Sequence, residues 1–206
     1  MLMDGNDRFV RGQRCHPNQD ADHRAALAPG QRPFAVVFGC SDSRLAAEII
    51  FDRGLGDLFV VRTAGHVSGP EVLGSIEYGV QVLDAPLVVV LGHDSCGAVT
   101  AAAEAHRLGQ SPPGYVGDVV DRVLPSVLGA TAKGLSTVDE FVDEHIRRTA
   151  DFLLSRSTLL AGAVEQGRCG IVGLSYRLAE GTVQRVASHG VIGRIGDEDA
   201  TSGATH

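Results

Sequence analysis

Four short runs of apolar residues, each rich in valine, constrain the possible folds of this chain more than any other feature. They span residues 34–39, 58–62, 87–92 and 170–176, and none of them alternates polar with apolar positions. Strands of a parallel sheet lose that alternation because both of their faces are covered. Segments with helical spacing separate the runs. The order therefore predicts an α/β fold, with a central, mostly parallel sheet flanked by helices.

The segments with helical spacing are residues 44–51, 71–83, 96–108 and 115–164. The third is expected to end at Gly109, because glycine is common directly after a helix. The fourth is expected to break near Pro125 and again near Lys133 and Gly134, since proline and glycine interrupt helices. A final extended piece is expected over residues 182–189.

Composition and charge exclude several classes of protein. The chain has 206 residues, of which 44% are hydrophobic, and no repeat or long linker divides it. A single domain over residues 1–206 is expected, with a frayed tail over the last ten. Twenty-five acidic against eighteen basic residues, with no basic cluster, argue against a nucleic-acid partner. No apolar run approaches the roughly 20 residues of a membrane helix. No secretory signal opens the chain, so the cytoplasm is the expected location.

Cysteine and histidine residues follow two of the expected strands. In the cytoplasm the four cysteines, Cys15, Cys40, Cys96 and Cys169, are expected to stay reduced and to act as metal ligands or buried thiols. Cys40 follows the first strand, His93 follows the third, and Cys96 begins a helix. If these strands are neighbours, the three side chains converge at one sheet edge. Two thiolates and an imidazole suit tetrahedral Zn²⁺ and leave a fourth, catalytic position open. His-x-x-Cys alone is a weak signal, since buried cysteines and core histidines are common.

An acid and a base follow Cys40 closely, in the segment 40-CSDSR-44. If Arg44 pairs with Asp42, it keeps that carboxylate ionised and oriented, so that Asp42 can accept a hydrogen bond from a zinc-bound hydroxide. The alternative is a capping arrangement, in which Ser41 or Asp42 caps a helix that begins near Arg44.

Residues 40–66, 74–83 and 91–99 strongly resemble the β-class carbonic anhydrases of the mycobacterial and actinobacterial type, and the likeness runs from residues 4–12 through 189–193. Its specific motifs are Cys-x-Asp-x-Arg and His-x-x-Cys-Gly. The resemblance implies that Cys40, His93 and Cys96 bind one zinc ion per subunit. It also implies that Asp42 and Arg44 form a dyad beside the metal, with Asp42 as a conditional fourth ligand.

The activity implied by the resemblance is the reversible hydration of CO₂ to bicarbonate and a proton, by attack of zinc-bound hydroxide. The substrate pocket is expected to include Gln31, Phe59, Ala64, Tyr78 and Gly97. Some members of the family supply part of this pocket from a neighbouring subunit, so a homodimer or homotetramer is expected. Packing alone could also explain Phe59 and Tyr78.

A proton must leave after each hydration, and a histidine near the pocket mouth that titrates near neutrality could relay it. His66 is the candidate, although most exposed histidines are simply solvated.

Two departures from the family pattern stand out. Relatives with a second, inhibitory bicarbonate site carry tryptophan at the position of Val37, beside residues matching Arg62 and Tyr176. This chain has no tryptophan, so that site is expected to be incomplete. The N-terminal arm before residues 4–10 is also expected to be short or truncated compared with the arm usual in the family.

Three other functions compete with CO₂ hydration. One is a non-catalytic zinc module in which Asp42 permanently fills the fourth position. Another is a hydrolase of CS₂ or COS on the same fold. The third, nucleotide binding, is disfavoured because the chain has no G-x-x-x-x-G-K-[ST] motif.

Overall fold

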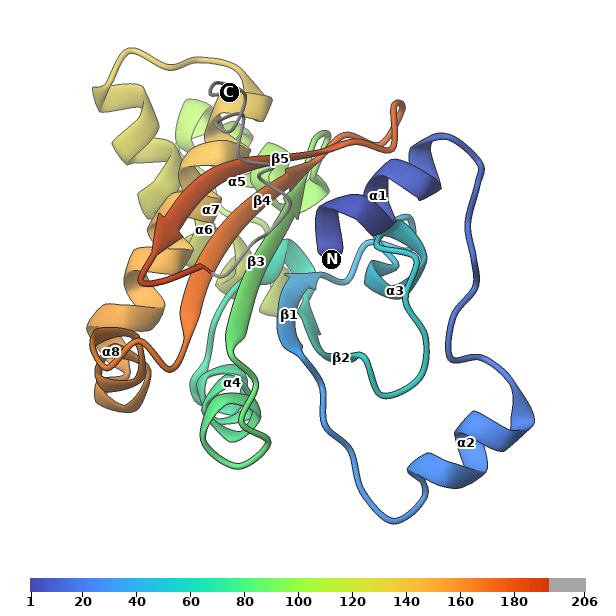
Figure 1. The fold of residues 1–206 in the computed structure, drawn as a ribbon. Helices are drawn as coiled ribbons and strands as arrows, with labels where there is room; N and C mark the ends of the chain where they lie inside the picture. The colour runs from blue at the N-terminus through green and yellow to red at the C-terminus, as the bar shows by residue number, and fades with distance from the viewer. Residues whose placement is uncertain (193–206) are drawn as a thin grey trace, which may run out of the picture.

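A five-stranded sheet forms the centre of the protein, and its strand order is β2-β1-β3-β4-β5 (Figure 1). A computed structural model describes residues 1–192; the expected frayed tail lies outside this range. The strands are β1 (Ala35–Cys40), β2 (Leu58–Thr63), β3 (Leu87–His93), β4 (Gly170–Tyr176) and β5 (Val183–His189). All neighbouring pairs are parallel except β4 and β5. The predicted α/β fold with a mostly parallel sheet is therefore confirmed.

The burial of the strands explains why apolar runs in the sequence predict them. Every residue of β1 and β4 is buried, as is all of β3 apart from its first residue. The edge strand β2 is only half-buried, and β5 on the other edge exposes several positions. Each of the four predicted strands agrees with the structure to within one residue at either end.

The helices of the described residues surround this sheet. They are α1 (Leu2–Val10), α2 (Ala21–Leu27), α3 (Ala47–Ile50), α4 (Pro70–Gln81), α5 (Gly97–Leu108), α6 (Tyr115–Ala132), α7 (Val138–Arg156) and α8 (Thr158–Glu165), with a 3₁₀ turn, η1 (Ala64–His66). The N-terminal helices α1 and α2 lie on the side of β1 and β2, whereas α7 and α8 lie on the side of β4 and β5 (Figure 1). Within residues 1–192, no helix is long and apolar enough to cross a membrane.

The predicted break at Pro125 is wrong. Helix α6 continues through Pro125, which lies on its exposed side. The same helix buries Val120, Val123 and Val127 completely in the core. Packing of this apolar face offsets the backbone hydrogen bond that proline removes. The break at Lys133 and Gly134 is confirmed.

The predicted helix over residues 44–51 is shorter than expected. Helix α3 begins only at Ala47. The preceding residues form a turn in which the backbone N–H of Leu45 donates to the carbonyl of Asp42 over 2.9 Å. This turn takes the chain from β1 past the sheet edge, and it holds Asp42 at that edge.

Candidate metal centre

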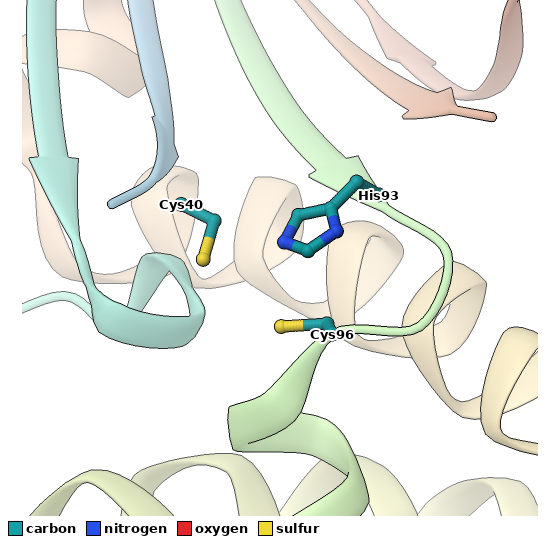
Figure 2. Close-up of side chains that lie close together, drawn as sticks. All are labelled: Cys40, His93 and Cys96. Carbon is teal, nitrogen blue, oxygen red and sulfur yellow. The ribbon is translucent and has the colours of Figure 1, made fainter. Parts of the chain in front are cut away.

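Cys40, His93 and Cys96 converge at the carboxyl edge of the sheet, as the sequence predicted. Cys40 is the last residue of β1, His93 is the last residue of β3, and Cys96 directly precedes α5. Strands β1 and β3 are neighbours. The two sulfur atoms and the imidazole point into one space between these elements, as Figure 2 shows, and one ligand atom from each residue lies within 4.8 Å of the others. All three side chains are buried.

The turn η1 closes one side of this cluster. The backbone N–H of Gly65 donates to Sγ of Cys40 over 3.3 Å, which favours a thiolate at that sulfur. Gly65 has a φ of 60°, and a Cβ at this position would lie 2.6 Å from Cβ of Ala98 in α5. Only glycine combines this backbone conformation with such a close approach. Gly65 therefore lets η1 contact α5 and bring its N–H to Cys40.

One nitrogen of the His93 ring is free to bind a cation. Nδ1 lies 2.8 Å from the carbonyl oxygen of Asp94. Because a carbonyl only accepts, Nδ1 carries the proton and Nε2 carries the lone pair. Nε2 is buried and has no hydrogen-bond partner. Such an arrangement is typical of a metal-binding histidine, whose second nitrogen is oriented by a backbone or carboxylate oxygen.

The two thiols differ in acidity because they face each other. A hydrogen bond from Cys96 lowers the pKa of the Cys40 thiol, and the hydrogen bond to Cys40 raises the pKa of Cys96. A cation that binds both sulfurs must displace their protons. The donor set of two sulfurs and one imidazole nitrogen matches zinc, whose tetrahedral ligands lie about 3.5 to 3.8 Å from one another.

Asp42 and Arg44 form a bidentate ion pair beside the cluster. Nε of Arg44 lies 2.9 Å from Oδ1 of Asp42, and a terminal guanidinium nitrogen lies 2.7 Å from Oδ2. These hydrogen bonds hold the pKa of Asp42 well below its usual range. Oδ2 also lies 3.8 Å from Nε2 of His93, so the carboxylate borders the space between the three ligands. The capping alternative is wrong for α3, which begins only at Ala47 and has no side-chain cap. Oδ1 of Asp42 does accept the backbone N–H of Arg44 over 2.9 Å, in the turn before that helix.

Comparisons with known proteins agree with this geometry. The structure of CafA from Aspergillus fumigatus, described as a β-carbonic anhydrase, superposes with a TM-score of 0.68 at 28% identity, covering 80% of this chain and 81% of that one. The sequence profile of the family described as "Carbonic anhydrase" matches residues 35–183. The chain belongs to the β-class carbonic anhydrase family. Carbonic anhydrase 2 of Mycobacterium tuberculosis is 57% identical over 96% of this chain and 94% of its own length. The carbonic anhydrase of Mycolicibacterium smegmatis is 56% identical over 94% of each chain. The prediction of a carbonic anhydrase enzyme is thereby confirmed.

Two residues that support this carbonic anhydrase site were not predicted in that role. Arg62 in β2 donates to the carbonyl oxygen of Cys40 over 3.0 Å and to that of Asp42 over 2.6 Å. It thereby fixes the segment that carries both the ligand and the dyad. His145 in α7 lies with Nε2 2.9 Å from the carbonyl oxygen of Gly65. Gly65 and His145 are 80 residues apart, so no local sequence pattern indicates their contact. The contacts of Arg62, in contrast, follow from the pairing of β2 with β1.

His66 does not lie at the mouth of the site, so that prediction is wrong. Its side chain is 1% exposed and packs between the rings of Phe38 and His145. Burial lowers the pKa of His66 well below its usual value. The ring therefore stays neutral near neutral pH and does not exchange protons with solvent as a surface relay does.

The five predicted pocket residues divide into two groups. Ala64 and Gly97 are exposed at the sheet edge, next to the metal-ligand cluster. Gln31 is exposed in the loop that precedes β1, at the opposite end of that strand. Phe59 pairs with Val36, four residues before Cys40 and thus about 13 Å away along the strand.

The fifth of these residues, Tyr78, lies with Phe59. Their ring centroids are 6.1 Å apart, and Tyr78 is 47% exposed. Within one chain, Gln31, Phe59 and Tyr78 therefore do not reach the metal-ligand cluster.

The region expected to hold a second bicarbonate site is nearly filled. Val37 and Arg62 line a cavity of about 10 Å³, which is room for about one water molecule. Arg62 is also engaged with two backbone carbonyls. The expectation that this site is incomplete stays a prediction, and the lack of space supports it.

Proposed function

We propose that residues 1–206 form one zinc-binding domain that catalyses the reversible hydration of CO₂ to bicarbonate and a proton. One observation carries this proposal: three buried ligand atoms within 4.8 Å of one another border a paired Asp42 and Arg44. Three protein ligands leave a fourth position, which is the arrangement of catalytic rather than structural zinc.

Cys40, His93 and Cys96 would hold the zinc, and Nε2 of His93 would be its nitrogen ligand. Bound zinc supplies hydroxide at neutral pH by lowering the pKa of a bound water to about 7. We place the protein in the cytoplasm, where thiols remain reduced and free to bind a metal. The four cysteines are all free in the structure, which agrees with that location.

Asp42 would orient the attacking nucleophile. Its carboxylate accepts hydrogen bonds only, because its lowered pKa keeps it ionised at neutral pH. Arg44 occupies both oxygens, and this holds Asp42 away from the metal position while leaving lone pairs for a nucleophile. The same pairing argues against the non-catalytic alternative, in which Asp42 would be a permanent ligand. Exposed Ala64 and the backbone of Gly97 would border the uncharged substrate.

The remaining pocket residues would come from a second copy of the chain. Gln31 and Tyr78 are exposed, and β2 is an edge strand with one unpaired side. Unpaired strand edges are commonly covered by another chain. We therefore propose at least a homodimer, in which Gln31, Phe59 and Tyr78 of each subunit complete the pocket of its partner.

A CO₂ hydration assay tests the function. We expect the zinc-loaded protein to hydrate CO₂ between pH 7 and 9, to lose activity when a chelator removes the metal, and to regain activity on addition of zinc. Parallel assays with CS₂ and COS compare the three substrates. Zinc binding without turnover would establish a non-catalytic module, and faster hydrolysis of CS₂ or COS would establish the alternative enzyme.

Subunit complementation tests the shared pocket. We expect Gln31→Ala to lower activity by about tenfold, because a hydrogen bond to the reacting groups is lost. Cys96→Ala should abolish activity by removing a metal ligand. If Gln31 acts across the interface, unfolding the two variants together and refolding them should restore activity in mixed dimers. In such a dimer the intact metal site of one chain meets the intact Gln31 of the other.

Each variant refolded alone is the control for this experiment, and sedimentation verifies that dimers form. An active monomer, or a mixture no more active than the sum of its parts, would contradict the shared pocket.

A further inference from the structure

A chain of three hydrogen bonds leads from α6 through α7 and η1 to a metal ligand. The hydroxyl of Ser126 in α6 lies 2.8 Å from Nδ1 of His145 in α7, and Nε2 of His145 lies 2.9 Å from the carbonyl oxygen of Gly65. The N–H of Gly65 in turn donates to Sγ of Cys40 over 3.3 Å. All four residues are buried. The chain therefore connects two helices outside the metal centre to the sulfur of a ligand.

The chemistry of the partners fixes the direction of each hydrogen bond. Because a carbonyl only accepts, Nε2 of His145 carries the ring proton, and Nδ1 accepts from the hydroxyl of Ser126. Burial lowers the pKa of His145 to about 4, so the ring is neutral at neutral pH. A neutral imidazole has one donor and one acceptor, and His145 uses both. Ser126 thereby selects the tautomer that donates to Gly65.

The turn that receives the hydrogen bond from His145 needs support from outside. Gly65 and His66 both have a left-handed backbone conformation, with φ angles of 60° and 39°. This conformation is uncommon for residues other than glycine, and it persists where the surrounding structure fixes it. The carbonyl of Gly65 belongs to the peptide group that joins these two residues. The hydrogen bond from His145 therefore acts directly on the left-handed segment.

The two hydrogen bonds of Gly65 lie on adjoining peptide groups. Only the Cα of Gly65 separates the carbonyl that His145 contacts from the N–H that Cys40 accepts, so a rotation of the backbone there moves both. Glycine has more freedom for such a rotation than any other residue. Holding the carbonyl therefore restricts the direction of the N–H. An N–H directed at Sγ of Cys40 favours the thiolate, which is the form that binds a metal.

We propose that His145 is a positioning residue of the metal centre, which holds the carbonyl of Gly65 and so keeps the N–H of Gly65 on Sγ of Cys40. This role rests on the proposed binding of zinc by Cys40. Groups that orient a ligand from outside the metal affect both the affinity for the metal and the electronic properties of the site. The alternative is that His145 only satisfies a buried carbonyl, which would leave the metal properties independent of it.

Substitution of His145 tests the proposal through two measurements besides turnover. One is the zinc affinity, from competition with a chelator, and the other is the sulfur-to-metal charge-transfer band of the cobalt-loaded protein. In His145→Leu both hydrogen bonds of the ring are lost. We expect zinc affinity to fall by about tenfold, the lower end of the range for loss of a group that orients a ligand. The band should move to longer wavelength, because a thiolate that accepts fewer hydrogen bonds holds its electrons less tightly.

Three further variants separate positioning from packing. His145→Gln retains an N–H donor for the carbonyl of Gly65, so both measurements should lie closer to those of the native protein than to those of His145→Leu. Ser126→Ala should change both in the same direction as His145→Leu but less, because the tautomer is no longer fixed. Glu144→Gln is the matched control and should change neither. Glu144 is the equally buried neighbour in α7, and it pairs with Lys133 at 2.7 Å.

The outcomes distinguish failure of this role from failure of the metal centre. The role of His145 is overturned, with zinc binding intact, if His145→Leu keeps the native zinc affinity or the native charge-transfer band. It is also overturned if Glu144→Gln changes the measurements as much, or if His145→Gln behaves like His145→Leu. Should His145→Leu not fold, Ser126→Ala decides by the same criteria. A native protein that binds no zinc would overturn the proposed metal centre together with this role.

Discussion

Replacing Cys96 with alanine is expected to remove zinc from the protein, whereas replacing Cys169 with alanine is expected to leave the zinc content unchanged. Both side chains are almost fully buried, so the two substitutions delete the same atom from similarly packed surroundings. Only Cys96 lies with Cys40 and His93. Cys169 precedes β4 at the opposite end of the sheet from His93, and burial raises the pKa of its thiol to about 11, so it stays protonated.

Metal analysis after dialysis measures this difference. Removing a residue that only hydrogen-bonds to a metal ligand lowers the metal affinity by about 10- to 100-fold. Removing the ligand itself should therefore lower the affinity by more than about 100-fold. CO₂ hydration should fall with the metal in Cys96→Ala and persist in Cys169→Ala. Circular dichroism of both variants verifies that each has folded. Full zinc retention by Cys96→Ala, or loss of zinc from Cys169→Ala, would refute the assignment of the ligands.

The convergence of Cys40, His93 and Cys96 could be predicted because it depends only on topology. Residues that end neighbouring parallel strands meet at one edge, and the valine-rich runs identified the strands. The dyad was predictable for a similar reason, since Asp42 and Arg44 are two residues apart and their contact is local. The positions of the strand ends therefore determine where most residues of the metal centre lie.

The surroundings of the centre could not be predicted in the same way. His66 lies two residues beyond an exposed position, and its burial depends on Phe38 in β1 and His145 in α7. Helix α6 likewise passes through Pro125 because distant residues pack against its valine face, which local propensity does not show. These outcomes depend on contacts between elements far apart in sequence, and one sequence alone carries no record of such contacts.

Removing Arg44 is expected to lower turnover while zinc stays bound. In the native protein Arg44 pairs with both oxygens of Asp42. In Arg44→Ala both guanidinium hydrogen bonds to Asp42 are lost, and only the backbone N–H of residue 44 still donates to Oδ1. The carboxylate lies 3.8 Å from the ligand nitrogen of His93, close enough to rotate onto the metal as a fourth ligand. The position needed by the nucleophile is then occupied. We expect CO₂ hydration to fall by about 100-fold, which is typical when a positioned acid–base group is lost.

The pH dependence distinguishes occupation of the metal by Asp42 from a general structural effect of the Arg44→Ala substitution. The lowered pKa of Asp42 keeps it ionised from pH 6 to 9, so a rise in native activity from about pH 7 to 8.5 reflects ionisation of the metal-bound water rather than of Asp42. With cobalt in place of zinc, the native absorption spectrum should titrate over that range. The spectrum of Arg44→Ala should be insensitive to pH, because a carboxylate replaces the water.

A double variant completes the test. In Arg44→Ala with Asp42→Asn, the neutral amide competes poorly for the metal, so the cobalt spectrum should titrate again although turnover stays low without the carboxylate. Arg107→Ala is the control for loss of an exposed arginine. If Arg44→Ala keeps full activity at every pH, or if its cobalt spectrum titrates like that of the native protein, Arg44 does not hold Asp42 away from the metal.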